Sequence, residues 1–164
     1  MSGRDSIRVH LETGDLKVDF EGDSKQVFES LLRFISQVYP NIEILRKVTY
    51  TPDLVNIMNE ILGLVEISSE GPIINPNLDL STRNAICLAL LGAYIGNRIG
   101  KLNKDTLSVS DLSRLTGKAR KTVTNELPKL IENGLVERVC EGEYRITELG
   151  IRRTEDVIKA IKGL

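Results

Sequence analysis

The chain contains 164 residues, of which 41% are hydrophobic, and it carries a formal net charge of −1 at pH 7. This apolar fraction can form a hydrophobic core in one domain or two small ones, and it excludes an intrinsically disordered chain. The balance of 22 basic and 23 acidic side chains excludes a uniformly basic, histone-like coat. No apolar run reaches the roughly 18 residues of a membrane-spanning helix, and the N-terminus lacks the apolar core of a signal peptide. We therefore expect a cytoplasmic protein without membrane contact.

The first part of the chain predicts a β-hairpin followed by two helices. Apolar and polar residues alternate over residues 7–20 on both sides of a turn-forming Gly14, the pattern of a hairpin. Ser24 is the expected N-cap of the first helix, and Thr51 with Pro52 is the expected start of the second. Residues 1–67 are thus predicted to form an α+β module, and no known family is recognised in it. We expect this module to serve assembly or contact with a protein partner.

Residues 68–80 contain two prolines and a Gly-Pro pair, which is typical of a linker or an ordered connecting loop. Ser81 then caps a predicted helix that runs to about Gly100 and is apolar nearly all round, as in a buried central helix. Small residues recur in it about one turn apart, so another segment can approach closely, either inside the domain or at a self-association seam. These residues are Ala89, Gly92, Gly96 and Gly100.

The remaining chain predicts two short helices, a strand pair and a final helix. Ser108 and Asp111 have the spacing of a capping box, Gly117 ends the helix that they begin, and Asn133 with Gly134 ends the next helix. The predicted bounds are 109–116 and about 120–132 for the helices, 135–139 and 144–146 for the strands, and 147–164 for the last helix, with Thr147 as its expected cap.

This order of elements is similar to that of the winged helix-turn-helix superfamily. The resemblance covers residues 81–164, about half of the chain, and is carried by VSDLSRLTG, KTVTNELPKLIENGLVER and YRITELG. It implies an α+β protein with a C-terminal winged helix-turn-helix domain. It also implies a transcription regulator that binds double-stranded DNA, with the second helix of the motif in the major groove.

The resemblance places eight polar side chains at the DNA, six around the start of the recognition helix and two on the wing strands. They are Lys118, Arg120, Lys121, Thr122, Thr124 and Asn125, and Arg138 and Arg145. Arginine and lysine neutralise phosphates or reach guanine, asparagine bonds adenine, and threonine suits either contact. Cations are disfavoured at a helix N-terminus. Their presence there indicates an anionic partner, whereas a merely solvated face is the alternative.

Three residues or segments depart from the family pattern. Ala119 stands where an N-capping serine or threonine is frequent, and Pro128 removes the N–H partner of the Thr124 carbonyl inside the recognition helix. The wing tip, residues 141–143, carries two acids that would repel phosphates. An alternative function is therefore a winged helix that binds protein or serves as an assembly scaffold without contacting DNA.

Nothing in the sequence favours an enzyme, a cofactor or a metal site. His10 is the single histidine and lies on the polar side of the predicted hairpin. No glycine-rich loop has the strand–loop–helix context or the Gly-Lys-Ser/Thr ending of a phosphate site. Cys87 and Cys140 are expected to be separate buried thiols. The scarcity of glutamine, with only two in the chain, leans toward a thermophilic source.

Charge is distributed unevenly between the two parts of the chain. Residues 1–80 carry 7 basic and 13 acidic side chains, a net charge of −6, and residues 81–164 carry 15 and 10, a net charge of +5. This asymmetry favours nucleic-acid contact at the C-terminal end only. The last helix has an apolar face with Ile151, Ile158 and Ile161, which either closes the domain core or forms a homodimer seam suited to palindromic DNA sites.

Overall fold

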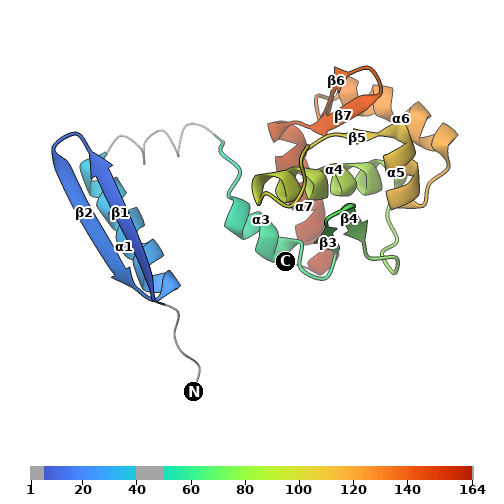
Figure 1. Ribbon diagram of the computed structural model, residues 1–164. Helices are drawn as coiled ribbons and strands as arrows, with labels where there is room; N and C mark the ends of the chain where they lie inside the picture. The colour runs from blue at the N-terminus through green and yellow to red at the C-terminus, as the bar shows by residue number, and fades with distance from the viewer. Residues whose placement is uncertain (1–5, 40–49, 164) are drawn as a thin grey trace. The chain divides into compact units, whose positions relative to one another are not determined.

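A computed structural model describes residues 6–39 and 50–163, and the chain divides into two compact units, residues 1–50 and 51–164. A β-hairpin comes first, and helices and further strands follow (Figure 1). This confirms the predicted α+β class. None of the described helices is long and apolar enough to cross a membrane.

The first unit is a two-stranded antiparallel sheet with one helix. β1 (Ile7–Thr13) pairs with β2 (Leu16–Gly22), and α1 (Ser24–Val38) follows. The Phe20 ring of β2 meets the Phe34 ring of α1 edge to face, with 5.7 Å between centroids. The predicted N-cap, Ser24, is wrong by one residue, because the carboxylate of Asp23 accepts the Gln26 N–H at 3.0 Å and closes the helix start.

The second unit is built around α4 (Thr82–Arg98), whose side chains are buried on nearly every side. Ser81 caps this helix through the Asn84 N–H, as predicted. Ile86, Leu90 and Leu91 are completely buried. Strands and helices from both sides of α4 in the sequence pack against it, so it forms the centre of the core (Figure 1).

A second hairpin occupies part of the segment predicted to be a connection. β3 (Val65–Ser68) pairs with β4 (Gly71–Ile74), and both strands pack on α4. The close approach requires Gly92, because a Cβ there would lie 2.5 Å from the Cβ of Pro72. Gly92 and Gly96 are therefore needed for tight packing inside the unit. Of the two alternatives for these two glycines, internal packing is the one observed.

The helix α3 (Leu54–Glu60) packs with the second unit, whereas the sequence prediction grouped it with the hairpin module 1–67. Its Ile57 side chain is completely buried, and Glu60 pairs with Lys159 of the last helix at 3.7 Å. The helix also begins two residues later than predicted. Asp53, not Thr51, is the N-cap and accepts the Asn56 N–H at 3.2 Å.

A three-stranded antiparallel sheet and two helices follow α4. The sheet order is β5-β7-β6, and the bounds in chain order are β5 (Leu107–Ser108), α5 (Val109–Thr116), α6 (Arg120–Glu132), β6 (Val136–Cys140) and β7 (Glu143–Ile146). The capping box between Ser108 and Asp111 is present, and Gly117 ends α5 in the left-handed region at φ 67°. The strand β5 was not predicted from the sequence, because two residues are too few to show an alternation of apolar and polar side chains.

The last helix, α7 (Glu148–Lys162), closes the core of the second unit. Thr147 caps it as predicted. Ile151 and Ile158 are buried inside the unit, whereas Ile161 is 39% exposed. Most of this apolar face therefore serves the core.

The two cysteines are free thiols, and only one of them is buried. Cys87 lies inside α4, as expected. Cys140 is exposed at the end of β6, so the expectation of a buried thiol is wrong for this residue. Its neighbours Val139 and Glu141 are exposed as well, so this end of β6 offers no core for the thiol to enter.

Candidate nucleic-acid interface

The N-terminal half of α6 presents a continuous polar surface to solvent, which we call the α6 polar face. Its five residues are all exposed: Arg120, Lys121, Thr122, Thr124 and Asn125. The other side of the same helix carries Val123, Leu127 and Leu130, which are at most 2% exposed. These buried side chains fix the rotation of the helix, and the polar residues therefore point away from the core.

The start of α6 is uncapped. Ala119 occupies the N-cap position, makes no side-chain hydrogen bond, and is followed by no acid in the first turn. The first intrahelical bond runs from the Val123 N–H to the Ala119 carbonyl at 3.0 Å. The N–H groups of the first turn of α6, which precede Val123, thus have no helical acceptor, and the helix dipole adds partial positive charge at this end. Arg120 and Lys121 add two full charges at the same end.

Lys118 lies outside the α6 polar face and has a structural contact. Its half-buried side chain donates from Nζ to the Leu80 carbonyl oxygen at 3.0 Å. Its backbone is held as well, because the Ser113 hydroxyl donates to the Lys118 carbonyl at 2.8 Å. The turn between α5 and α6 is thereby joined to the segment that precedes α4.

Two features inside α6 concern its backbone. The Thr124 hydroxyl donates to the Arg120 carbonyl at 2.9 Å, so that hydroxyl proton is used within the helix. Pro128 lies within the helix, four residues after Thr124. Proline has no N–H, and the Thr124 carbonyl therefore lacks its regular helical donor, as the sequence indicates.

The two strand arginines differ in what surrounds them. Arg145 of β7 donates from Nε to the Glu137 carboxylate at 2.7 Å and lies 4.0 Å from Asp105. The hydrogen bond and the charge of Glu137 raise the pKa of Arg145 above its usual value. Arg138 of β6 is exposed. The strand that carries Arg138 packs against α6.

The acids of the β6–β7 turn are not equivalent. The Glu143 carboxylate is turned back onto the protein, where it accepts from the Thr106 hydroxyl at 2.6 Å and pairs with Lys104 at 2.9 Å. The Thr106 hydrogen bond, with a smaller effect from Lys104, lowers the pKa of Glu143. Glu141 is exposed. The negative charge at the hairpin tip is thus a single carboxylate rather than two.

Three cations remain available for an anionic partner in the described part of the chain near α6. Arg120, Lys121 and Arg138 make no ion pair with any residue of 6–39 or 50–163. Exposed guanidinium and ammonium groups beside free helix N–H groups form a site for phosphate oxygens. The amide of Asn125 and the Thr122 hydroxyl add neutral hydrogen-bonding groups to the same face.

Two arginines that were not predicted as site residues, Arg83 of α4 and Arg153 of α7, line one cavity in the folded protein. Arg83 gives a local signal, since it is a cation in the first turn of a helix, where cations are disfavoured. Arg153 gives none, because only the packing of α7 on α4 places it there.

Within residues 6–39 and 50–163, no group of three or more metal-ligating side chains comes together. Comparisons of the chain with protein-family models, with curated proteins and with solved structures found no match.

Proposed function

We propose that residues 81–164 form a winged helix-turn-helix domain and that the protein is a cytoplasmic, DNA-binding transcription regulator. The observation that carries this proposal is the pair Arg120 and Lys121 at the uncapped start of α6, which are exposed and make no ion pair with another residue that the structure describes. The order of elements from α4 to α7, with the hairpin β6–β7 after α6, supports the proposal because the resemblance rests on the same order.

In the proposed complex, the N-terminal turns of α6 enter the major groove. The free N–H groups of its first turn donate to a phosphate, and Arg120 and Lys121 neutralise phosphates or donate to guanine O6 and N7. Asn125 is suited to a bidentate contact with adenine. Arg138 reaches the DNA backbone from β6. Lys118 and Arg145 support this surface from within the protein.

A fluorescence anisotropy titration with labelled 30-base-pair genomic duplexes tests this proposal over a series of salt concentrations. Wild-type protein is expected to bind with an affinity that falls steeply as the salt concentration rises. Contacts between basic side chains and phosphates release counterions from the DNA, and added salt opposes this release. In the double variant Arg120→Gln, Lys121→Gln, the slope of log K against log salt is expected to become shallower by about 2. The matched control is Lys101→Gln with Lys162→Gln, which removes two exposed charges elsewhere.

Two results would contradict this proposal. One is a wild-type affinity that does not depend on the salt concentration, and the other is a double variant that keeps the wild-type slope, because Arg120 and Lys121 would then not bind phosphate. Selection of bound fragments from a genomic library then decides between general and sequence-specific binding.

A second candidate function is a protein-interaction module, which two observations favour. Glu141 leaves an exposed carboxylate at the hairpin tip, where a phosphate backbone would be repelled. On α1, Phe28 and Leu32 are 53% and 40% exposed in the first unit, so that unit offers apolar surface to a protein or a second copy. Light scattering against the monomer mass of 18.3 kDa tests self-association. Absence of DNA binding at low salt, together with a stable complex, would favour this function.

A further inference from the structure

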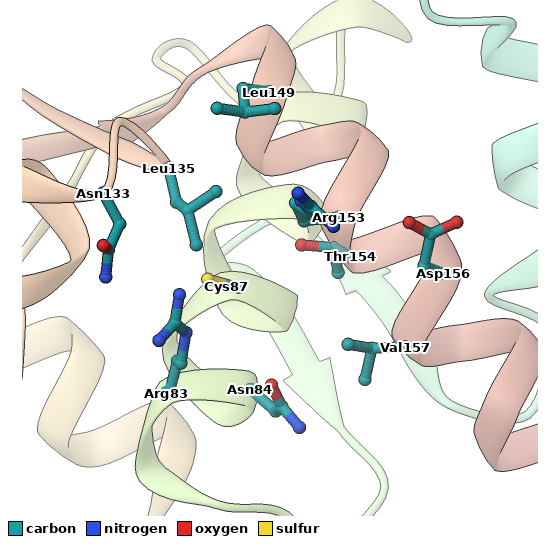
Figure 2. Close-up of a pocket in the computed structure, with 10 residues that line it drawn as sticks. All are labelled: Arg83, Asn84, Cys87, Asn133, Leu135, Leu149, Arg153, Thr154, Asp156 and Val157. Atoms are coloured by element: carbon teal, nitrogen blue, oxygen red, sulfur yellow. The ribbon is translucent and has the colours of Figure 1, made fainter.

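A cavity of about 410 Å³ opens between three parts of the second unit. The first turns of α4, the turn between α6 and β6, and the middle of α7 form its walls (Figure 2). None of the residues of the α6 polar face lines it. This volume falls within the range of roughly 300–1,000 Å³ that is usual for small-molecule sites.

Two arginines face this cavity from different helices. Figure 2 shows the Arg83 side chain rising from the first turn of α4 toward Cys87, with Arg153 on α7 above it. Both arginines are exposed, and neither makes an ion pair or hydrogen bond with a residue in the described part of the chain. Asp156 is the single carboxylate among the lining residues. The cavity therefore carries an excess of positive charge.

The remaining polar groups do not offset this charge. Burial raises the pKa of the Cys87 thiol to about 11, so the thiol is neutral at physiological pH. The Thr154 hydroxyl donates to the Gly150 carbonyl at 2.7 Å. Asn84 and Asn133 contribute neutral amides, which can donate to a further oxygen of a ligand.

Apolar side chains form the rest of the lining. Leu135 is buried, Val157 is half-buried, and Leu149 is 46% exposed beside the cavity mouth. A ligand with an apolar body would cover the exposed leucine. A site with an apolar wall and a few convergent cations is suited to an amphipathic anion.

We propose that this cavity binds a small organic anion, with its carboxylate or phosphate group between Arg83 and Arg153 and its apolar body against Leu135, Leu149 and Val157. This ligand is an effector. Asn133 is the first residue of the α6–β6 turn and the C-cap of α6, and it lines the cavity, so an occupied cavity alters the end of the helix that carries the α6 polar face. The coupling to DNA rests on the proposed function, whereas ligand binding does not.

Isothermal titration calorimetry on the full chain tests binding with four probes: hexanoate, hexyl phosphate, hexanol and inorganic phosphate. We expect at least one of the two hexyl anions to bind. Hexanol, which lacks the charge, and inorganic phosphate, which lacks the apolar body, should bind at least about tenfold more weakly. Comparison of the hexyl anions identifies the preferred headgroup.

Arg83→Gln and Arg153→Gln are each expected to weaken binding of the preferred anion at least about tenfold, since each removes a charge-assisted contact. Lys162→Gln, which removes an exposed cation of α7 outside the cavity, should bind as wild type does. Melting curves followed by circular dichroism establish that all variants are folded. Absence of binding by both hexyl anions, equal binding of hexanol, or wild-type affinity in both arginine variants would overturn the proposed site.

The coupling has a separate readout. A saturating concentration of the preferred hexyl anion is expected to change the DNA dissociation constant several-fold in the wild type, and to leave it unchanged in the Arg83→Gln, Arg153→Gln double variant. An unchanged constant in the wild type rejects the effector role. If no DNA binds under any condition, the proposed function fails while the calorimetric result still decides the site.

Discussion

At the scale of single residues, basic side chains around α6 with the same sequence signal have different surroundings in the folded protein. Lys118 and Arg120 are two residues apart, yet the first bonds the Leu80 carbonyl and the second is exposed. Arg138 and Arg145 differ in the same way, because Glu137 pairs with Arg145. Charge in the sequence predicted a basic region, but the fold decided the partner of each cation, since Leu80 is 38 residues from Lys118 and strand pairing places Glu137 opposite Arg145.

Replacement of Lys118 by methionine tests its structural role. The variant Lys118→Met keeps the aliphatic stem but leaves the Leu80 carbonyl without its 3.0 Å donor. We expect a loss of about 1–2 kcal/mol in the free energy of unfolding, typical of a half-buried hydrogen bond to a charged group. Urea denaturation measures this loss, and the salt slope of DNA binding should stay as in the wild type. A stable variant with a shallower slope would instead place Lys118 at the DNA.

Glu143 predicts a pH dependence of stability. Thr106 and Lys104 lower the pKa of Glu143 in the folded protein. The contribution of Glu143 to the free energy of unfolding is therefore complete above the ordinary glutamate pKa of about 4.3. That contribution is lost as the pH falls through the lowered pKa, because the protonated acid no longer accepts from both partners. Glu143→Gln should cost up to about 1 kcal/mol at pH 7 and less at pH 3, where the contribution of Glu143 has begun to fall. Thermal melts at both values measure the difference, and an equal cost at pH 3 would contradict it.

At the scale of elements, several boundaries with a local chemical cause were predictable, whereas the N-caps of α1 and α3 lie one and two residues from the predicted positions. The capping box of Ser108 and Asp111 and the cap Thr147 are where the sequence indicates. The hairpin β3–β4 was missed because its Gly-Pro pair is also typical of a loop. It becomes a strand pair through packing on Gly92, which no local pattern records. The α6 polar face was predictable as a set, whereas the cavity with Arg83 and Arg153 required the tertiary structure.

Alanine substitution of the two α4 glycines measures how rigid that packing is. In both variants a better helix former gains about 1 kcal/mol. In Gly92→Ala the new Cβ meets the rigid Pro72 ring at 2.5 Å. In Gly96→Ala it meets two half-buried side chains that can rotate, Leu102 at 2.5 Å and Ile67 at 2.9 Å. We expect Gly92→Ala to lose about 1–3 kcal/mol overall and Gly96→Ala to lose less. Chemical denaturation ranks the two variants by their free energy of unfolding. The reverse order would show that β4 moves more readily than the Leu102 side chain.

At the scale of the whole molecule, the unit boundary changes the meaning of the charge asymmetry. The net charges of −6 and +5 belong to residues 1–80 and 81–164, a division of the chain at residue 80. The compact unit 51–164 carries 15 basic and 15 acidic side chains, because the acids of α3 and the β3–β4 hairpin belong to it. Its positive charge is therefore local, at the start of α6 and at the cavity with Arg83 and Arg153, and not a property of the unit as a whole.

The division also predicts how the pieces behave alone. Residues 51–164 contain the whole α4-centred core, and a protein cut to this range is expected to unfold in one cooperative transition. Residues 1–50 include a single fully buried apolar residue, Val27, within the described range 6–39, and we expect no cooperative transition from this piece alone. Circular dichroism melts of both fragments check these outcomes. A cooperative melt of residues 1–50 would reveal self-association or a stability that the monomer does not explain.

The position of Pro72 has a consequence at high protein concentration. The β3–β4 hairpin is a two-stranded sheet, and no other strand of residues 6–39 or 50–163 pairs with either of its edges. Such an open edge can recruit a strand from another molecule. Pro72 stands opposite Ile67, one step from the pair Ser68 and Gly71 that closes the two-residue turn. Alternation of the ladder makes this a non-hydrogen-bonded pair, so the position without an N–H faces outward. The same ring that fits over Gly92 therefore removes a donor from the open edge and opposes extension of the sheet into an aggregate.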